Sequence, residues 1–316
     1  MKATQIMAVG GIYVDINCPN APFGNSGLHV EEELVAGDYE EAIGGSGPNF
    51  AKLAAHLGLP VTVVAKTGDD RMNSVVGMLL SETRFSPDLI VDRAVSTNVS
   101  INMVNAAGAY MSFVGGTANQ SITADEVMAK LKPRLSQLSH LYIGGSFKLK
   151  ALLPGLGAII QAAKAAGVKV ALDHSRIYST VSDEQKALVR TAVAEVDYYF
   201  PSKQEFLQLW AVDSIDEGLH KLGEHTTAIT VVKDSDNGAL VMHDGEVVRV
   251  PAYAVHPIHT VGAGDSFNAG FMVAQADGRS VQESMRFGCA AAGLTISRHE
   301  MPTASAIVAL VAGGQS

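Results

Sequence analysis

Short apolar runs alternate with longer amphipathic segments along most of this chain. The apolar runs are rich in Val, Ile and Leu and predict strands over 6–9, 61–65, 141–143, 168–172, 196–200 and 228–232. The segments between them predict helices over 50–57, 124–138, 156–166 and 183–194, and an Ala-rich helical run covers 281–310. This alternation is typical of an α/β fold with a mostly parallel sheet and helices on both faces. Ligands bind such a sheet at the carboxyl ends of its strands.

Two segments depart from this alternation. Residues 16–43 contain several prolines and glycines and little helical period, whereas residues 97–118 predict a hairpin with its turn near 105–108. Together they suggest a small β flap, which over the strand ends would act as a lid that excludes water. Two loops without a shared role are the other interpretation.

Composition indicates one large globular domain over 1–316. Apolar residues make up 47% of the 316 residues and the formal charge is −9, so we expect neither a nucleic-acid partner nor a membrane surface. The two cysteines, Cys18 and Cys289, lie far apart and indicate no disulfide framework. We also find no signal-peptide core and no apolar run long enough to span a membrane, and we expect a cytoplasmic protein.

The segment 261–271, VGAGDSFNAGF, is the strongest candidate for chemistry. Its small residues Gly262, Ala263 and Gly264 let backbone N–H groups converge at a predicted helix start, which makes an anion site suited to a phosphoryl group. Asp265 beside it could accept a proton from an attacking hydroxyl. An Asp at a helix start is expected to have a low pKa, and it could instead simply cap the helix.

A second glycine-rich segment, GGSGPNFA, covers 44–51. Gly44 and Gly45 allow a ligand to approach the backbone closely, and the amide of Asn49 suits sugar hydroxyls. A plain tight turn into a helix is the alternative. Asp15 follows the first predicted strand and could bind substrate hydroxyls or cap a turn. The chain has no Walker-type phosphate loop, and His256 and His259 lack further metal ligands in the sequence.

These segments together resemble the ribokinase family of carbohydrate and nucleoside kinases, also called the phosphofructokinase B (PfkB) family. Residues 44–51 are similar to its N-terminal glycine-rich signature, and 260–267 to its C-terminal signature. Gly11 and Asp15 are similar to its sugar-contacting turn. The likeness covers nearly the whole chain, both insertions included.

The resemblance implies a doubly wound α/β domain with a β lid, ATP as phosphoryl donor and Mg²⁺. Asp265 would be the base for a primary hydroxyl, with the anion hole at 262–264. The sugar would be held by Asp15, Gly44, Gly45 and Asn49. Nucleotide and metal contacts would come from Ser202, Glu205, Lys233, Ser235, Gly238 and Cys289, with Glu205 acting on Mg²⁺ through water. Relatives often dimerise through the lid, so a homodimer is expected here too.

Several positions differ from the family pattern. His259 and the pair Glu300 and Met301 stand where residues near a monovalent-cation site are expected, so activation by potassium is not expected. Ser202, Ser235 and Cys289 replace an Asn, a Gly and an Asn on the nucleotide side. Ser46 and Tyr13 replace a Lys and an Asn, which argues against a plain ribose kinase.

Three hypotheses remain open from the sequence. The first is an active sugar kinase, which the base, the anion hole and Glu205 favour. The second is a non-catalytic ligand-binding protein on the same fold, which the altered nucleotide-side positions favour. The third keeps the kinase chemistry with a nucleoside acceptor, whose base could stack on Tyr110 or Phe113.

Overall fold

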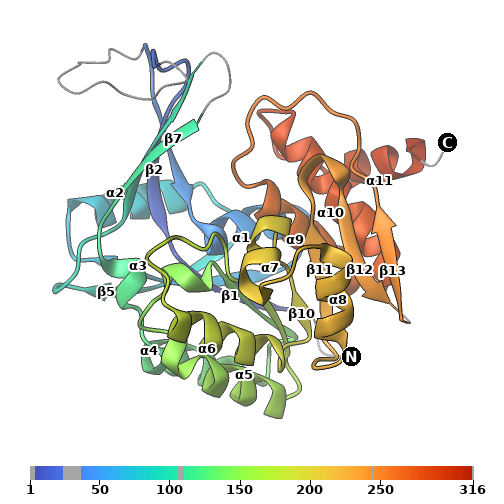
Figure 1. The fold of residues 1–316 in the computed structure, drawn as a ribbon. Helices are drawn as coiled ribbons and strands as arrows, with labels where there is room; N and C mark the ends of the chain where they lie inside the picture. The colour runs from blue at the N-terminus through green and yellow to red at the C-terminus, as the bar shows by residue number, and fades with distance from the viewer. Residues whose placement is uncertain (1–3, 24–36, 106–109, 244, 315–316) are drawn as a thin grey trace.

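A computed structural model describes residues 4–23, 37–105, 110–243 and 245–314 of the chain. Its main body is one large sheet between two layers of helices, and a smaller sheet projects from it at the top left of Figure 1. The α/β fold with a mostly parallel sheet is therefore confirmed. Within the described ranges, no helix combines the length and apolar character needed to cross a membrane.

The large sheet has nine strands in the order β13-β12-β11-β10-β9-β8-β1-β4-β5. Their bounds are β1 Ile6–Gly10, β4 Val61–Gly68, β5 Ser86–Asp92, β8 His140–Gly144, β9 Lys169–Asp173, β10 Tyr198–Tyr199, β11 Ile229–Lys233, β12 Ala239–His243 and β13 Glu246–Val250. All neighbours pair in parallel except β12, which is antiparallel to β11 and β13. The chain builds outward through β4 and β5 on one side of β1, and through β8 to β11 on the other, so the order reverses at β1.

The side chains of β1 alternate between two hydrophobic cores. Ile6 and Ala8 join the core under α1 (Ser46–His56), α2 (Arg71–Leu80), α9 (Ala263–Ala276), α10 (Val281–Ile296) and α11 (Ala304–Gly313). Met7 and Val9 join the core under α4 (Ala124–Leu131), α5 (Leu156–Ala165), α6 (Asp183–Val193), α7 (Lys203–Trp210) and α8 (Ile215–Gly223). Because both faces are buried, the parallel strands read as continuous apolar runs. Short helical turns complete the body at α3 (Ala118–Ser121), η1 (Lys132–Arg134), η2 (Ser146–Lys148), η3 (Leu153–Gly155) and η4 (Ser235–Asn237).

Two predicted helices end earlier than expected. The α-helix predicted over 124–138 stops at Leu131, where Pro133 enters a 3₁₀ turn. The helical run predicted over 281–310 is divided into α10 and α11, with Pro302 in the connection. Proline lacks the N–H group that a helix interior needs, which accounts for both breaks.

The smaller sheet has the order β3-β2-β6-β7, with β2 Tyr13–Cys18, β3 Glu40–Gly44, β6 Val99–Val104 and β7 Tyr110–Gly115. Its strands come from the two segments singled out in the sequence. The sheet is antiparallel except for the central pair β2 and β6. Residues 24–36 of the first segment, the predicted turn residues 106–108, and residue 109 lie outside the described residues.

The start of α1 lies directly against the end of β1. A Cβ atom on Gly10 would stand 2.5 Å from the Gly47 nitrogen, which is closer than non-bonded atoms approach. Gly45 precedes the helix with a φ of 103°, and a Cβ there would stand 2.0 Å from the Gly11 carbonyl oxygen. Glycine at these positions lets the glycine-rich segment reach the strand ends.

Replacing Gly10 by Ala should therefore destabilise the protein by about 1–3 kcal/mol through overpacking. Gly157 provides a matched control, because it lies in helix α5 with no atom within 4 Å of an added Cβ. Gly157→Ala should stabilise by about 0.5–1 kcal/mol. Urea midpoints of both variants and the parent measure this, and equal midpoints for the two variants would contradict the close approach.

Candidate active site

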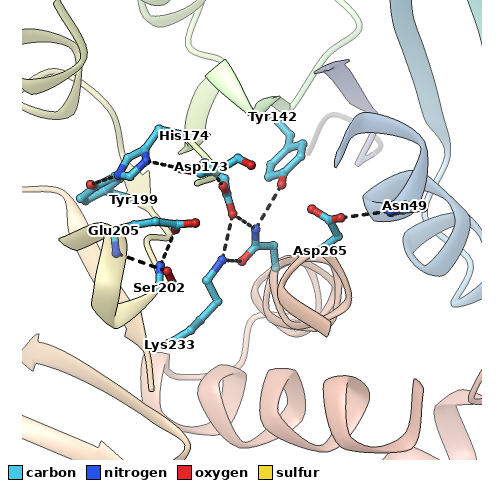
Figure 2. Close-up of polar contacts among 11 residues, drawn as sticks. Asn49, Tyr142, Asp173, His174, Tyr199, Ser202, Glu205, Lys233 and Asp265 are labelled. Atoms are coloured by element: carbon cyan, nitrogen blue, oxygen red, sulfur yellow. Dashed lines mark hydrogen bonds and ion pairs between the residues drawn. The ribbon is translucent and has the colours of Figure 1, made fainter. Parts of the chain in front are cut away.

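Asn49 and Asp265 of the predicted site lie near Tyr142, Asp173 and Lys233 at the ends of β9 and β11, and these side chains form a polar cluster (Figure 2). Asn49 comes from α1 and Asp265 from α9, two helices that pack against each other on the same face of the sheet. Asp173 ends β9 and Lys233 ends β11. The reversal of strand order beside β1 thus coincides with the polar cluster, as expected for ligand sites in open α/β sheets.

Asp265 does not cap its helix. Helix α9 begins after Gly262, whose φ of 78° is left-handed, and the helix start has no side-chain cap. The Asp265 carboxylate instead accepts a hydrogen bond from the Asn49 side-chain amide at 3.2 Å. The carboxylate is thereby turned toward the glycine-rich segment of α1 and left free of a capping role.

The helix start presents backbone N–H groups beside this carboxylate. Ser266 makes the first intrahelical bond, to the Gly262 carbonyl at 2.8 Å. In the described part of the chain, the N–H groups of Gly264 and Asp265 have no backbone acceptor. A Cβ on Gly264 would lie 3.4 Å from the Lys233 ammonium nitrogen, so a cation stands next to them. N–H groups, helix dipole and ammonium together suit a phosphoryl anion.

The expected low pKa of Asp265 is wrong. Burial raises the pKa of this carboxyl to about 7, and the nearby Asp173 carboxylate raises it as well, against Lys233, Asn49 and Lys148. The position in the helix favours the ionised form, but desolvation and the like charge outweigh it. A carboxyl that titrates near neutrality is a better proton acceptor than an ordinary Asp.

Asp173 and Lys233 form a buried ion pair at 2.8 Å, and Asn268 from α9 joins them. The Asn268 amide donates to Asp173 at 2.7 Å and to the Tyr142 hydroxyl at 3.1 Å, and its carbonyl oxygen accepts from Lys233 at 3.2 Å. Every hydrogen-bonding atom of the Asn268 side chain is thus used, as a buried amide requires. The network fixes α9, and with it Asp265, relative to the strand ends.

Asp15, on β2, lies against Gly44 of the glycine-rich segment. A Cβ on Gly44 would stand 1.8 Å from an Asp15 carboxylate oxygen, so Gly44 leaves the space that this carboxylate occupies. Burial raises the pKa of Asp15 to about 6, against Lys52, Lys148 and a hydrogen bond from Asn102. The Lys52 ammonium donates to the Ile43 carbonyl, and burial lowers its pKa although Asp15 and Asp265 oppose this.

Comparisons with known proteins match this arrangement. The model of the pfkB family carbohydrate kinases matches residues 3–306. The chain belongs to the pfkB family of carbohydrate kinases. It is 27% identical over 332 residues to the 5-dehydro-2-deoxygluconokinase of Bacillus subtilis, covering 98% of this chain and 96% of the relative. It is 28% identical over 279 residues to the ribokinase of Haemophilus influenzae, covering 84% and 85%.

Among solved structures, an E. coli protein described as a Ribokinase II, in complex with ATP and Mg²⁺, superposes with a TM-score of 0.82. It is 18% identical and covers 98% of this chain and 99% of its own. The fold is therefore ribokinase-like, and the resemblance inferred from the sequence motifs is confirmed. Membership of this family favours an enzyme over the non-catalytic alternative.

Four of the predicted nucleotide-side residues of this kinase, Ser202, Lys233, Ser235 and Gly238, lie around the end of β11. Ser202 begins α7 in a capping box: its hydroxyl accepts from the Glu205 N–H at 3.4 Å, and the Glu205 carboxylate accepts from the Ser202 N–H at 2.8 Å. Ser202 also pairs with Lys233 in an isolated bridge. A cavity of about 340 Å³ is lined by Ser202, Glu205, Arg176 and neighbouring side chains.

Ser235 and Gly238 turn the chain after β11. Ser235 has a φ of 50°, a left-handed conformation that glycine adopts at lower energy and that matches the family glycine at this position. Gly238 has a φ of 91°, and a Cβ there would stand 2.0 Å from the Val250 carbonyl oxygen. Cys289 lies apart in the middle of α10, where burial raises the pKa of its thiol to about 12. Across the described residues, no hydrogen bond or ion pair joins Cys289 to the polar cluster.

Sequence reasoning missed Lys52, Lys148, Asp173 and Asn268. Lys52 and Asn268 each lie three residues after a predicted site residue, so helical spacing places them on the same side of α1 and α9. Asp173 follows the predicted strand over 168–172 directly, which is a usable signal in a parallel sheet. Lys148 follows its strand only after a 3₁₀ turn, and no local pattern marks it.

The activity of this kinase should rise with pH through about 7, because an Asp265 that accepts a proton must first be ionised. Asp173→Asn removes the like charge and should move this acidic limb to lower pH. The limb is read from kcat/KM measured between pH 5 and 9. Asp183→Asn, a change at an exposed helix residue, should leave it unmoved. A limb near pH 4 in the parent protein would contradict the raised pKa.

Proposed function

We propose that this protein transfers the γ-phosphoryl group of ATP to a primary hydroxyl group of a small sugar or sugar derivative. Asp265 accepts the hydroxyl proton, and the backbone N–H groups at 262–264 hold the transferred group. Asp15, Gly44, Gly45 and Asn49 hold the sugar. This proposal rests on the Asp265 carboxylate. It does not cap helix α9 but accepts a hydrogen bond from Asn49, and it lies beside the helix-start N–H groups of Gly264 and Asp265.

One half of the site suits the phosphate groups of ATP, and the other half suits the hydroxyl groups of the sugar. Lys233 beside Gly264 and the helix start favour anionic phosphate oxygens. Asp15, Asn49 and Asp265 offer carboxylate and amide groups, which bind sugar hydroxyls. In-line transfer needs a hydroxyl oxygen within about 3.2 Å of the Asp265 carboxylate and directed at the phosphorus atom. A smaller sheet closing over the strand ends as a lid would exclude the water that competes with the sugar.

Magnesium fits the residues near Ser202. Mg²⁺ is usually held by one or two carboxylates, several waters and the substrate phosphates. One Glu205 oxygen accepts from the Ser202 N–H at 2.8 Å, and we propose that the second oxygen binds a water of the ion. When bound, the ion would neutralise charge on the transferring phosphoryl group. Lys233, Ser235, Gly238, Ser202 and Cys289 remain the proposed nucleotide contacts.

We do not propose a monovalent cation at His259. Burial lowers the pKa of this imidazole, and His299 lowers it further, against a backbone hydrogen bond at Val261. A neutral imidazole supplies none of the negative charge that an aspartate would bring to such a site.

A sugar acceptor is favoured over a nucleoside by the position of Phe113. Its strand partner is Ile101, whereas Asp15 pairs with the adjacent residue Ser100. Because side chains alternate across a strand, Phe113 and Asp15 lie on opposite faces of the smaller sheet. Phe113 therefore does not stack on a base held at Asp15. The side chain of Tyr110, the other candidate, lies outside the described residues.

Asp265→Asn should lower turnover by about 10²–10⁴-fold, because the amide keeps the shape but accepts no proton. ADP release with Mg-ATP, measured over a panel of sugars and nucleosides, tests this. A thermal-shift assay of the variant with ATP serves as the folding and nucleotide-binding control. Turnover that survives Asp265→Asn within a factor of two, on whichever acceptor is best, would exclude Asp265 as the base.

The outer face of the smaller sheet is proposed to bind a second copy of the chain. Ile101 and Phe113 face each other across β6 and β7 and are 40% and 53% exposed. The inner face carries buried Ser100 and Asn102 instead. Apolar side chains on the solvent face of a sheet are typical of an interaction surface.

Phe113→Asp should shift the protein from dimer to monomer in sedimentation velocity, because it places a charge in the apolar contact. Glu246→Gln, on the exposed start of β13 at the far edge of the large sheet, is the control and should leave the dimer intact. A parent protein that sediments as a monomer at every concentration tested would refute the proposed contact.

A further inference from the structure

Lys148 brings a positive charge into the substrate side of the site without an acidic partner. It ends the 3₁₀ turn η2, directly after β8, and its side chain is half-buried. Its ammonium nitrogen lies 5.5 Å from the centroid of the Tyr13 ring. The buried lysines Lys66 and Lys233 each form an ion pair with an aspartate, at 2.9 and 2.8 Å. Among the described residues, no carboxylate forms such a pair with Lys148.

The ammonium of Lys148 opens onto a cavity of about 360 Å³ at the base of the smaller sheet. The cavity is lined by Tyr13, Asn98, Val114, Gly116, Asn119, Gln120, Phe147, Lys148, Lys150, Tyr178, Thr180 and Val181. Its lining thus holds two lysines, three side-chain hydroxyls and no Asp or Glu, in a chain whose formal charge is −9. Such a lining complements an anion, and the volume suits a small molecule.

This cavity adjoins the proposed sugar site. Tyr13, which forms part of its wall, packs against the substrate turn: a Cβ on Gly45 would lie 3.1 Å from the Tyr13 ring. Burial works against the charge of Lys148, but Tyr13, Tyr178, Asp265 and Asp15 together raise its pKa. The ammonium is therefore charged at neutral pH and lies within electrostatic range of both acidic side chains.

Lys148 and Lys52 together match the two carboxylates of Asp15 and Asp265 in number. Lys52 also acts on both of these carboxylates, from the side of α1. Asp173 already has its partner in Lys233. On the cavity side, Lys150 adds a further ammonium, and the wall that it shares with Lys148 holds hydroxyl, amide and apolar side chains and no Asp or Glu. Positive charge is therefore in excess where a bound sugar would extend away from Asp265.

We propose that the acceptor is a sugar acid, with its hydroxyl at Asp265 and its carboxylate on the ammonium of Lys148. This assignment rests on the proposed kinase function and names its substrate class. A single ammonium with neighbouring hydroxyl groups fits a carboxylate, which carries one charge. A sugar phosphate shares the anionic chemistry and is distinguished in the test.

The test compares acids with neutral sugars of the same carbon skeleton. Binding is measured by calorimetry on the full chain with D-gluconate, keto-deoxy hexonates, D-glucose, D-glucitol and D-glucose 6-phosphate. ADP release with Mg-ATP is measured on the same panel. At least one sugar acid should bind about 10- to 100-fold more tightly than its neutral counterpart and have a kcat/KM higher by about the same factor, which is what one charge-assisted hydrogen bond is worth.

Variants at Lys148 test whether this side chain binds the carboxylate of the acceptor. Lys148→Met should lower the ratio of the acid's to the neutral sugar's binding constant and kcat/KM to about one. The turnover of both acceptors changes as well, because Lys148 also acts on the pKa of Asp265. Lys148→Arg should keep the preference. Lys132→Met, at an exposed lysine of η1, is the matched control and should behave as the parent protein.

Each remaining outcome decides between the assignments. The sugar-acid assignment is overturned if neutral sugars are preferred, if no acid of the panel binds, or if Lys148→Met weakens acid and neutral sugar equally. The last result would mean that Lys148 only balances Asp15 and Asp265. A Lys148-dependent preference for the phosphate ester would replace the carboxylate by a phosphate. If acids bind through Lys148 but no acceptor is phosphorylated, the kinase proposal fails while the binding assignment stands.

Discussion

The site depends on balancing several charges in a volume that water reaches poorly. Asp173, Lys233, Asp265, Asp15 and Lys52 come from five separate elements and meet at the strand ends. Unpaired, each would be costly to bury. Asp173 therefore pairs with Lys233, which leaves the pKa of Asp265 to be set mainly by burial and by the remaining like charge. The positions of the helices follow from this, because Asn268 and Asn49 attach α9 to the sheet and to α1.

Much of the architecture could be predicted from the sequence because it follows from local patterns. The apolar runs predicted the strands β1, β4, β8, β9, β10 and β11 of the large sheet. Pro133 and Pro302, which interrupt two predicted helices, are visible in the sequence, although the predicted helices extended across both positions. The antiparallel strands β12 and β13 were missed. In β13 the side chains before Val250 are exposed or half-buried, so it lacks the continuous buried run of the parallel strands. The pairing of strands that are distant in the sequence cannot be predicted from the pattern of any single segment.

The predictions for Asp265 show where local reasoning fails. Its neighbours identified it as a site residue, and the glycines explained the helix start. Whether it caps the helix depended on the conformation of Gly262, which places the cap position before the anion site. Its pKa depended on Asp173, which is 92 residues away in the chain and visible only in the folded protein. Helix position alone gave the wrong sign, because desolvation is a property of the whole fold.

The smaller sheet can hold a substrate residue on one face and contact a second copy of the chain on the other, because its two faces differ in polarity. Polar and apolar side chains alternate along β2 and β6, and paired residues lie on the same face. Asp15, Ser100 and Asn102 therefore face the site, whereas Ile101 and Phe113 face outward. The inner polar side chains bond to one another: Asn102 donates to Asn17 at 3.0 Å and accepts from Ser112 at 2.9 Å. A rigid inner face holds Asp15 in place, and an apolar outer face would gain from being covered. Covering one face would thus restrain the other, since a strand cannot move its two sets of side chains independently.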